Sequence, residues 1–232
     1  FYSVSDIANY MEDSRNFKFT NRVIIVPICA IVLIWMVYWV EITFNYNFNN
    51  YGILPQKIRG LKGVFFSPFI HGSTSHLFNN SVPLFILLGF LFFFYRIVAF
   101  KVLVVGTILT GILTWTYARN SYHIGASGVI YLLFSFIFFS GILRKHYRLV
   151  ALSLIIVFLY GGLIWYVFPI DDGVSWEGHL SGFLTGLMLT FLYKNKGPQK
   201  REFNYEKTEF DLMFDEDGNY NPPALEEMEE EQ

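Results

Sequence analysis

Ser127 lies in a Gly-Ala-Ser-Gly run and opens an apolar stretch that carries no charge until Arg144. His76 and His179 also stand at the starts of apolar stretches. Polar groups at membrane depth are energetically expensive and are usually kept for a purpose. A serine with a histidine in hydrogen-bond reach can act as a nucleophile with its general base. These residues therefore predict a reaction centre inside a bilayer.

The three positions suggest separate chemical roles. Ser127 is the candidate nucleophile, and His179 is the candidate base, which must be neutral to accept a proton. Asn80 follows His76 by one helical turn, so the two side chains share a face and both can donate to an oxygen. Ser127 starts a helix, so its backbone N–H has no intrahelical partner and the helix dipole favours negative charge there. These three donors predict an oxyanion hole.

Small residues would allow the helices that carry these groups to meet. Gly182 and Gly186 clear one face of the last apolar stretch, and such spacing lets helices approach closely. Gly125 and Gly128 leave the surface around Ser127 without bulky side chains. The glycine face of the last stretch therefore predicts close packing against the Ser127 helix. Dimerisation through the same glycines is the alternative.

The surroundings of the base favour a dyad over a triad. Tyr131 follows Ser127 by one turn and could pack against the His179 ring. Glu177 is close in sequence but points to another side of the helix, so no carboxylate is evident as a partner for His179. Taken alone, Ser127 would more often be a packing hydroxyl; the constellation on three helices reverses that expectation.

The composition indicates a membrane protein that positions these groups on helices. The 232 residues are 53% apolar and only 16% charged, whereas soluble domains carry about 25% charged residues. Each apolar stretch is about as long as a membrane-crossing helix, and together they predict an all-α, six-helix polytopic bundle over residues 22–194. The stretches are residues 23–44, 77–97, 102–117, 126–143, 149–168 and 176–193.

The placement of lysine and arginine predicts the orientation. With a cytoplasmic N-terminus, thirteen of the 17 basic residues fall in inner segments. The outer segments keep Lys57, Arg59, Lys62 and Arg119. Both termini are then cytoplasmic, and His76, Ser127 and His179 share the outer ends of their helices. We expect a multi-pass protein of the cell membrane, plasma or inner.

Three segments lie outside the simple bundle pattern. The aromatic linker at residues 45–70 predicts short helices in the outer interface, with an ordinary exposed loop as the alternative. Residues 1–21 are predicted to be a cytoplasmic N-terminal segment. Twelve of the 19 acidic residues follow Lys200, so residues 195–232 are predicted to be an acidic, largely disordered cytoplasmic tail. The small, dispersed basic excess before it predicts no nucleic-acid binding.

The remaining histidines and the cysteine receive minor roles. His123 competes with His179 as base, but we expect it to be an exposed loop residue. His146 is expected to be solvated, and Cys29 to be a buried, inert thiol. His71 and His76 are five residues apart, well off one helical face, and no further ligand set accompanies them. We therefore predict no metal or cofactor.

Three motifs, one in each even-numbered stretch, resemble the rhomboid family of intramembrane serine proteases in its six-helix, bacterial-type form. A Gly-x-Ser-Gly run alone is a weak signal, but the three in order are strong. The resemblance covers about residues 22–194. The motifs are His71-Gly-Ser-Thr-Ser-His76-Leu-Phe-Asn79-Asn80, Gly125-Ala-Ser127-Gly128-Val-Ile-Tyr131 and Gly178-His179-Leu-Ser-Gly182-Phe-Leu-Thr-Gly186.

The resemblance implies hydrolysis of peptide bonds in or beside transmembrane helices of substrate proteins. It implies that Ser127 attacks and His179 is the base, with His76 and Asn80 joining the Ser127 N–H in the oxyanion hole. It also implies that His71 supports the aqueous cavity and first loop and that Tyr131 stacks on His179. Many members carry a Trp-Arg pair where this chain has Lys62-Gly63, which leaves that loop's stabilising role unassigned.

Two other function classes remain open at this point. The first is a non-catalytic protein of the same fold that binds or sorts transmembrane client proteins. A transporter or channel would also line a cavity with polar groups, although the sequence shows no inverted repeat. The sequence identifies neither the substrate nor the oligomeric state.

Overall fold

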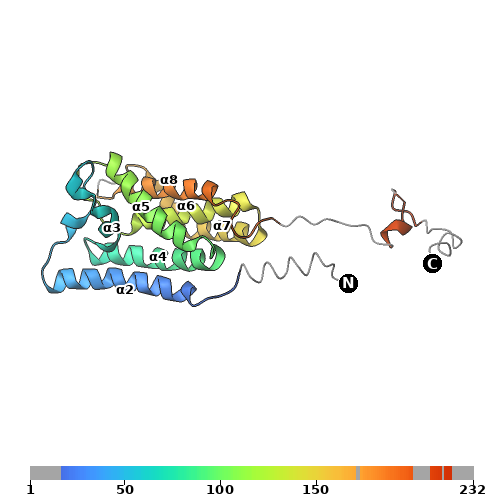
Figure 1. The fold of residues 1–232 in the computed structure, drawn as a ribbon, viewed down its shortest axis with the longest axis horizontal. Coiled ribbons are helices and arrows are strands. Elements are labelled where there is room, and N and C mark those ends of the chain that lie inside the picture. The colour runs from blue at the N-terminus through green and yellow to red at the C-terminus, as the bar shows by residue number, and fades with distance from the viewer. Residues whose placement is uncertain (1–16, 171–172, 201–209, 216, 221–232) are drawn as a thin grey trace. The chain divides into compact units, whose positions relative to one another are not determined.

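The computed structural model describes residues 17–170, 173–200, 210–215 and 217–220, and its main part is a bundle of helices (Figure 1). The long helices match the six predicted stretches to within a few residues, except that the fifth ends as a 3₁₀ helix. They are α2 (Arg22–Thr43), α4 (Thr74–Phe94), α5 (Ala99–Tyr117), α6 (Ser127–Arg144), α7 (Tyr147–Tyr160) with η4 (Gly161–Val167), and α8 (Trp176–Leu192).

In the part of the chain that the structure describes, five segments are long and apolar enough to cross a membrane: α2, α4, α5, α6 and the continuous stretch Tyr147–Val167. The sixth helix, α8, has 17 residues and buries polar side chains that include Ser181, Thr185 and Thr190. It packs against α5, α6 and η4. The protein is thus a polytopic helical membrane protein, and its most polar bundle helix is held by other helices.

The core is built around α6, most of whose residues are buried. It contacts α4, α5, α7 and α8, while α2 packs on α4 at the edge of the bundle (Figure 1). Leu87, Leu132 and Phe136 are among the fully buried apolar side chains between these helices. The helix that begins with Ser127 therefore occupies the most enclosed position in the fold.

The predicted close approach of the last helix to α6 is confirmed. A Cβ atom at Gly182 would collide with the carbonyl oxygen of Gly128, and one at Gly186 would collide with the carbonyl oxygen of Leu132. The glycine face of α8 is therefore covered by α6 of the same chain. The alternative that Gly182 and Gly186 serve dimerisation is wrong for this reason.

The linker between α2 and α4 forms the short helices that its sequence predicted. They are η1 (Asn49–Tyr51), η2 (Ile58–Gly60), α3 (Gly63–Phe66) and η3 (Ser67–Phe69). Its exposed side chains include large apolar ones beside polar and basic ones, as an interfacial segment requires. The exposed large apolar residues are Tyr46, Tyr51, Ile58, Leu61, Phe65 and Phe66.

At the bundle end opposite Ser127, Arg144 is buried at the end of α6. Its Nη2 donates to the carbonyl oxygen of Tyr193, 3.0 Å away, and its guanidinium lies 5.0 Å from the Tyr95 ring centroid. A cation at the C-terminal ends of α6 and α8 is favoured by both helix dipoles. Arg144 therefore ties these two helices together at their ends.

Away from the cleft, the expectations for His146 and Cys29 are wrong. His146 is buried, because it precedes α7, accepts a hydrogen bond from the Arg148 N–H and packs against Phe17. Cys29 is exposed on α2, because this edge helix turns much of its surface away from the bundle.

The chain divides into two compact units, Phe1–Lys200 and Arg201–Gln232. Most of the predicted N-terminal segment and tail lie outside the described residues. In the second unit, the described part contains the 3₁₀ helix η5 (Asp211–Met213) and a turn in which the Asp215 carboxylate accepts from the Asn219 N–H at 2.8 Å. The disorder of the tail stays a prediction.

Candidate active site

The structure brings the predicted catalytic and oxyanion-hole residues, with Tyr131, together in one cleft of about 870 Å³. His76 and Asn80 come from α4, Ser127 and Tyr131 from α6, and His179 from α8. All three helices contribute their N-terminal turns. The three polar helix starts, widely separated in sequence, therefore share one end of the bundle.

His179 is held in a defined orientation. Its ring stacks on Tyr131 with centroids 4.2 Å apart and planes at 11°, which is the packing predicted from the sequence. Its Nδ1 lies 2.9 Å from the carbonyl oxygen of Tyr166. A carbonyl can only accept, so Nδ1 carries the proton and Nε2 keeps its lone pair. The ring is thus in the tautomer that a general base requires.

Ser127 begins α6 immediately after Ala126, so its backbone N–H has no intrahelical acceptor. Among the described residues no direct hydrogen bond joins its hydroxyl to His179. Catalytic hydrogen bonds are often long or poorly aligned until a substrate binds. The Ser127 hydroxyl and the His179 ring therefore line the same cleft without a direct hydrogen bond between them in the described part of the chain.

Asn80 brings a donor that has no acceptor among the described residues into the cleft that Ser127 lines. The side-chain nitrogen of Asn80 is buried and unpartnered in the described structure, although Asn80 lines the cleft. A buried donor without a partner costs about 1–3 kcal/mol, which an oxygen bound in the cleft would offset. Gly125 has φ +107°, and a Cβ there would lie 2.6 Å from His76 Nε2. Glycine is required at Gly125 because the His76 ring occupies the space of a side chain.

His71 is buried beside this cluster, with its ring edge-on to His76 at 5.0 Å between centroids. It lies in the loop before α4. Burial, with a further contribution from His76, lowers the pKa of His71 to about 4. His71 is therefore neutral at physiological pH and supports the loop by packing.

This burial predicts acid sensitivity of the fold. Between pH 6.5 and 4 the unfolded chain binds a proton at His71 and the folded chain does not, so the free energy of unfolding falls as the pH drops, by roughly 3 kcal/mol at pH 4. Thermal unfolding in detergent from pH 7.5 to 4.5 measures this slope. His71→Gln should reduce this slope but not abolish it, because burial also lowers the pKa of His123. An unchanged slope in that variant would contradict the assignment.

His123 is not the exposed loop residue that the sequence suggested, since it is buried. Its Nδ1 lies 2.6 Å from the Ser175 hydroxyl and its Nε2 lies 3.0 Å from the Arg119 carbonyl. Its backbone exchanges hydrogen bonds with Ile53 of the α2–α4 linker. Both ring nitrogens are engaged, so His123 connects three loops and is not available as a base.

An ion pair between Arg119 and Glu177, which the sequence did not reveal, lies at the same end of the bundle. Glu177 is buried, and its Oε1 lies 3.5 Å from Nε of Arg119 and accepts from the Arg119 backbone N–H at 3.2 Å. Arg119 also donates to the Val174 carbonyl at 2.6 Å. The α5–α6 loop is thereby fixed to the start of α8. The partners are 58 residues apart, and no local pattern links them.

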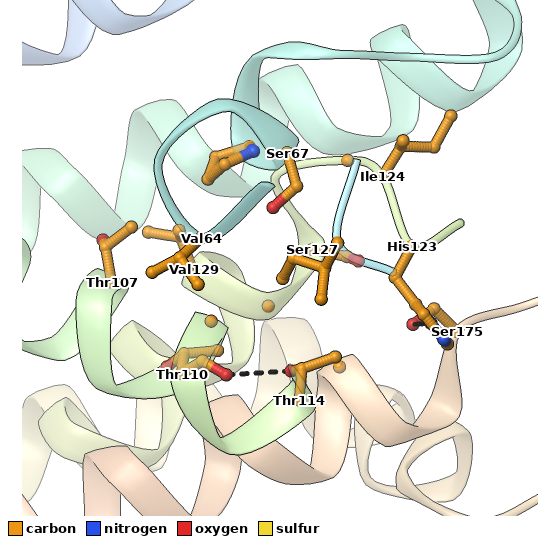
Figure 2. A pocket seen from close by; sticks show the side chains of 16 residues that line it. Val64, Ser67, Thr107, Thr110, Thr114, His123, Ile124, Ser127, Val129 and Ser175 are labelled. Atoms are coloured by element: carbon orange, nitrogen blue, oxygen red, sulfur yellow. Dashed lines mark hydrogen bonds between the residues drawn. The ribbon is translucent and has the colours of Figure 1, made fainter. Parts of the chain in front are cut away.

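A second, small cavity of about 30 Å³ lies beside Ser127, bounded by polar side chains of α5 (Figure 2). The Thr114 hydroxyl donates to the Thr110 carbonyl at 2.8 Å. The Thr110 hydroxyl oxygen is buried without a partner in the described structure. The space is large enough for a water molecule.

Fold and cleft together define a polytopic helical membrane protein that gathers a serine, histidines and an asparagine between its helices. The rhomboid domain family matches residues 59–196, more than half of the sequence. The chain therefore belongs to the rhomboid family.

Its relatives include an uncharacterized protein of Mycobacterium tuberculosis (strain ATCC 25618 / H37Rv), 33% identical over 172 residues that cover 70% of this chain and 71% of the relative. An uncharacterized protein of Mycobacterium leprae (strain TN) is 30% identical over 171 residues, covering 69% and 67%. Both relatives are uncharacterized, so they name no activity.

Proposed function

We propose that this protein is an intramembrane serine endopeptidase that cleaves transmembrane protein substrates in or beside their membrane-spanning helices. One observation carries the proposal: His179 stacks on Tyr131 and holds its proton on Nδ1, in the same cleft as Ser127. Membership of a family that includes serine proteases supports it further.

In the proposed reaction, the Ser127 hydroxyl oxygen attacks the carbonyl carbon of the scissile bond while its proton passes to Nε2 of His179. The resulting oxyanion accepts hydrogen bonds from His76, Asn80 and the Ser127 N–H. The C–N bond then breaks, and His179 gives its proton to the leaving amine. A water molecule hydrolyses the ester at Ser127 with His179 again as base.

The cleft requires a substrate whose backbone can leave its helix. The scissile carbonyl must reach Ser127 at the start of α6, so we expect substrates with a small residue at the cleaved bond and a locally unstable helix. The charge distribution supports a cleft open to the outer face of the cell membrane, with both termini cytoplasmic.

The deciding experiment compares purified wild type with Ser127→Ala in detergent, using a fluorescent substrate with one transmembrane helix. Cleavage by wild type alone supports the proposal, and equal cleavage by both overturns it. A fluorophosphonate probe separates the protease from a non-catalytic client binder: the protease is labelled at Ser127, whereas a binder leaves the probe unreacted.

Asn80→Ala should lower kcat by about 10²- to 10³-fold, because one oxyanion donor is lost while the nucleophile and base remain. Steady-state cleavage with the same substrate measures the change, and KM should move little. Asn50→Ala, in the exposed part of η1, is the matched control. A loss of kcat equal in both variants would contradict the role given to Asn80.

A further inference from the structure

The last seven residues of the fifth membrane stretch have an unusual backbone. After α7 ends at Tyr160, residues Gly161–Val167 continue as the 3₁₀ helix η4. Runs of this kind longer than three or four residues are uncommon and often mark functional positions. The side chain of Val167 is buried and that of Leu163 packs against the core, so η4 is anchored on the bundle with its backbone beside the cleft, which Leu163 and Tyr166 line.

Two carbonyl groups of η4 accept hydrogen bonds from the stacked ring pair. The Tyr131 hydroxyl donates to the Leu163 oxygen at 2.8 Å, and His179 Nδ1 donates to the Tyr166 oxygen at 2.9 Å. Residues three apart eclipse each other in a 3₁₀ helix. Leu163 and Tyr166 therefore present their carbonyls on the same side, one for each ring.

The sequence explains why the Tyr166 carbonyl is open to a side chain. In a 3₁₀ helix it would accept from the residue three positions later, which is Pro169 and has no N–H. The last such bond runs from the Phe168 N–H to the Trp165 oxygen, and the Ile170 N–H bonds to Phe168 instead. Pro169 thus ends the 3₁₀ pattern and leaves the Tyr166 oxygen for His179.

We propose that the Tyr166 carbonyl, left open by Pro169, is the positioning group that fixes the tautomer and orientation of His179. It accepts the hydrogen bond from Nδ1 that an aspartate carboxylate accepts from the catalytic histidine of a soluble serine protease. This inference rests on the proposed function for its effect on rate, but the tautomer itself is a property of the folded protein. Glu177, the nearest carboxylate in sequence, is engaged with Arg119.

The first test reads the tautomer without any catalysis. Nitrogen NMR of the full-length protein in micelles, with ¹⁵N-histidine, should show His179 protonated on Nδ1 at neutral pH, assigned by its loss in His179→Gln. Protonation on Nε2 would overturn the inference whether or not the protein is a protease.

The second test weakens one acceptor and keeps every side chain. An ester in place of the amide between Tyr166 and Val167 makes the Tyr166 oxygen a poorer acceptor. It should lower kcat about tenfold with KM unchanged, because binding does not use this bond. The control ester between Val167 and Phe168 removes a neighbouring N–H but leaves the Tyr166 oxygen as it is. Equal kcat values for the two esters would overturn the inference.

The third test restores the competing donor. Pro169→Ala supplies an N–H that competes for the Tyr166 oxygen, so kcat should fall, and N-methylalanine at residue 169 should restore it because it again lacks the N–H. Failure of N-methylalanine to rescue would overturn the inference. Absence of any Ser127-dependent cleavage by wild type would instead overturn the proposed function, and the NMR result would still decide the tautomer.

Discussion

Replacing His179 by alanine is expected to lower kcat by roughly 10⁴- to 10⁶-fold, and Ser127→Ala should cost about the same. The hydroxyl is a weak nucleophile at neutral pH unless a base takes its proton. His179 is the only described ring that is both in the cleft and fixed with a free Nε2 by its Nδ1 bond to a carbonyl. Each loss therefore removes the same step.

The double variant makes the prediction sharper. If Ser127 and His179 act as one unit, the double alanine variant loses no more than either single variant. Single-turnover cleavage of the fluorescent substrate in detergent measures all three. Ser140→Ala, a buried serine near the far end of α6, is the matched control and should keep its kcat. Losses that multiply would mean that the two residues act independently.

Gly182→Ala is expected to destabilise the fold by about 3 kcal/mol. The added Cβ would meet the Gly128 carbonyl oxygen, which is backbone in the most enclosed helix and cannot turn aside as a side chain can. The helices α6 and α8 would have to separate, and Ser127 and His179 would separate with them. Thermal unfolding in detergent should show the loss as a clearly lowered Tm.

The same substitution at Gly162 is the control for this prediction. A Cβ at Gly162 meets nothing within 4 Å, so Gly162→Ala should change the free energy of unfolding by only a few tenths of a kcal/mol. Similar Tm values for the two variants would contradict the packing account. A low Tm for Gly182→Ala alone would support it.

Hydropathy was sufficient to locate the helices because a membrane segment must satisfy its backbone internally and expose apolar side chains. It could not show how α7 ends. Gly161 and Gly162 weaken the α-helix, and Pro169 fixes where the 3₁₀ turn stops, but a window of mean hydropathy is insensitive to both. Residues 149–168 therefore read as one continuous helix.

The residues that line the cleft together could be predicted because their types are rare at membrane depth and recur at corresponding helix starts. The contacts that hold these residues in place could not be predicted. His123 and His146 lie in short polar links that read as exposed, yet both are buried by loops distant in the sequence. The Arg119–Glu177 pair and the Tyr166 carbonyl also depend on tertiary contacts. Cys29 was misjudged because apolar surroundings in a membrane helix do not imply burial in protein.

The bond from His179 to a main-chain oxygen has a genetic consequence. Every amino acid carries the same backbone carbonyl group. A missense mutation at residue 166 therefore cannot remove the acceptor. Apart from changes at His179 itself, natural variation can alter this bond by reshaping η4 or by replacing Pro169. Mutational scans should accordingly find residue 166 tolerant and residue 169 restrictive.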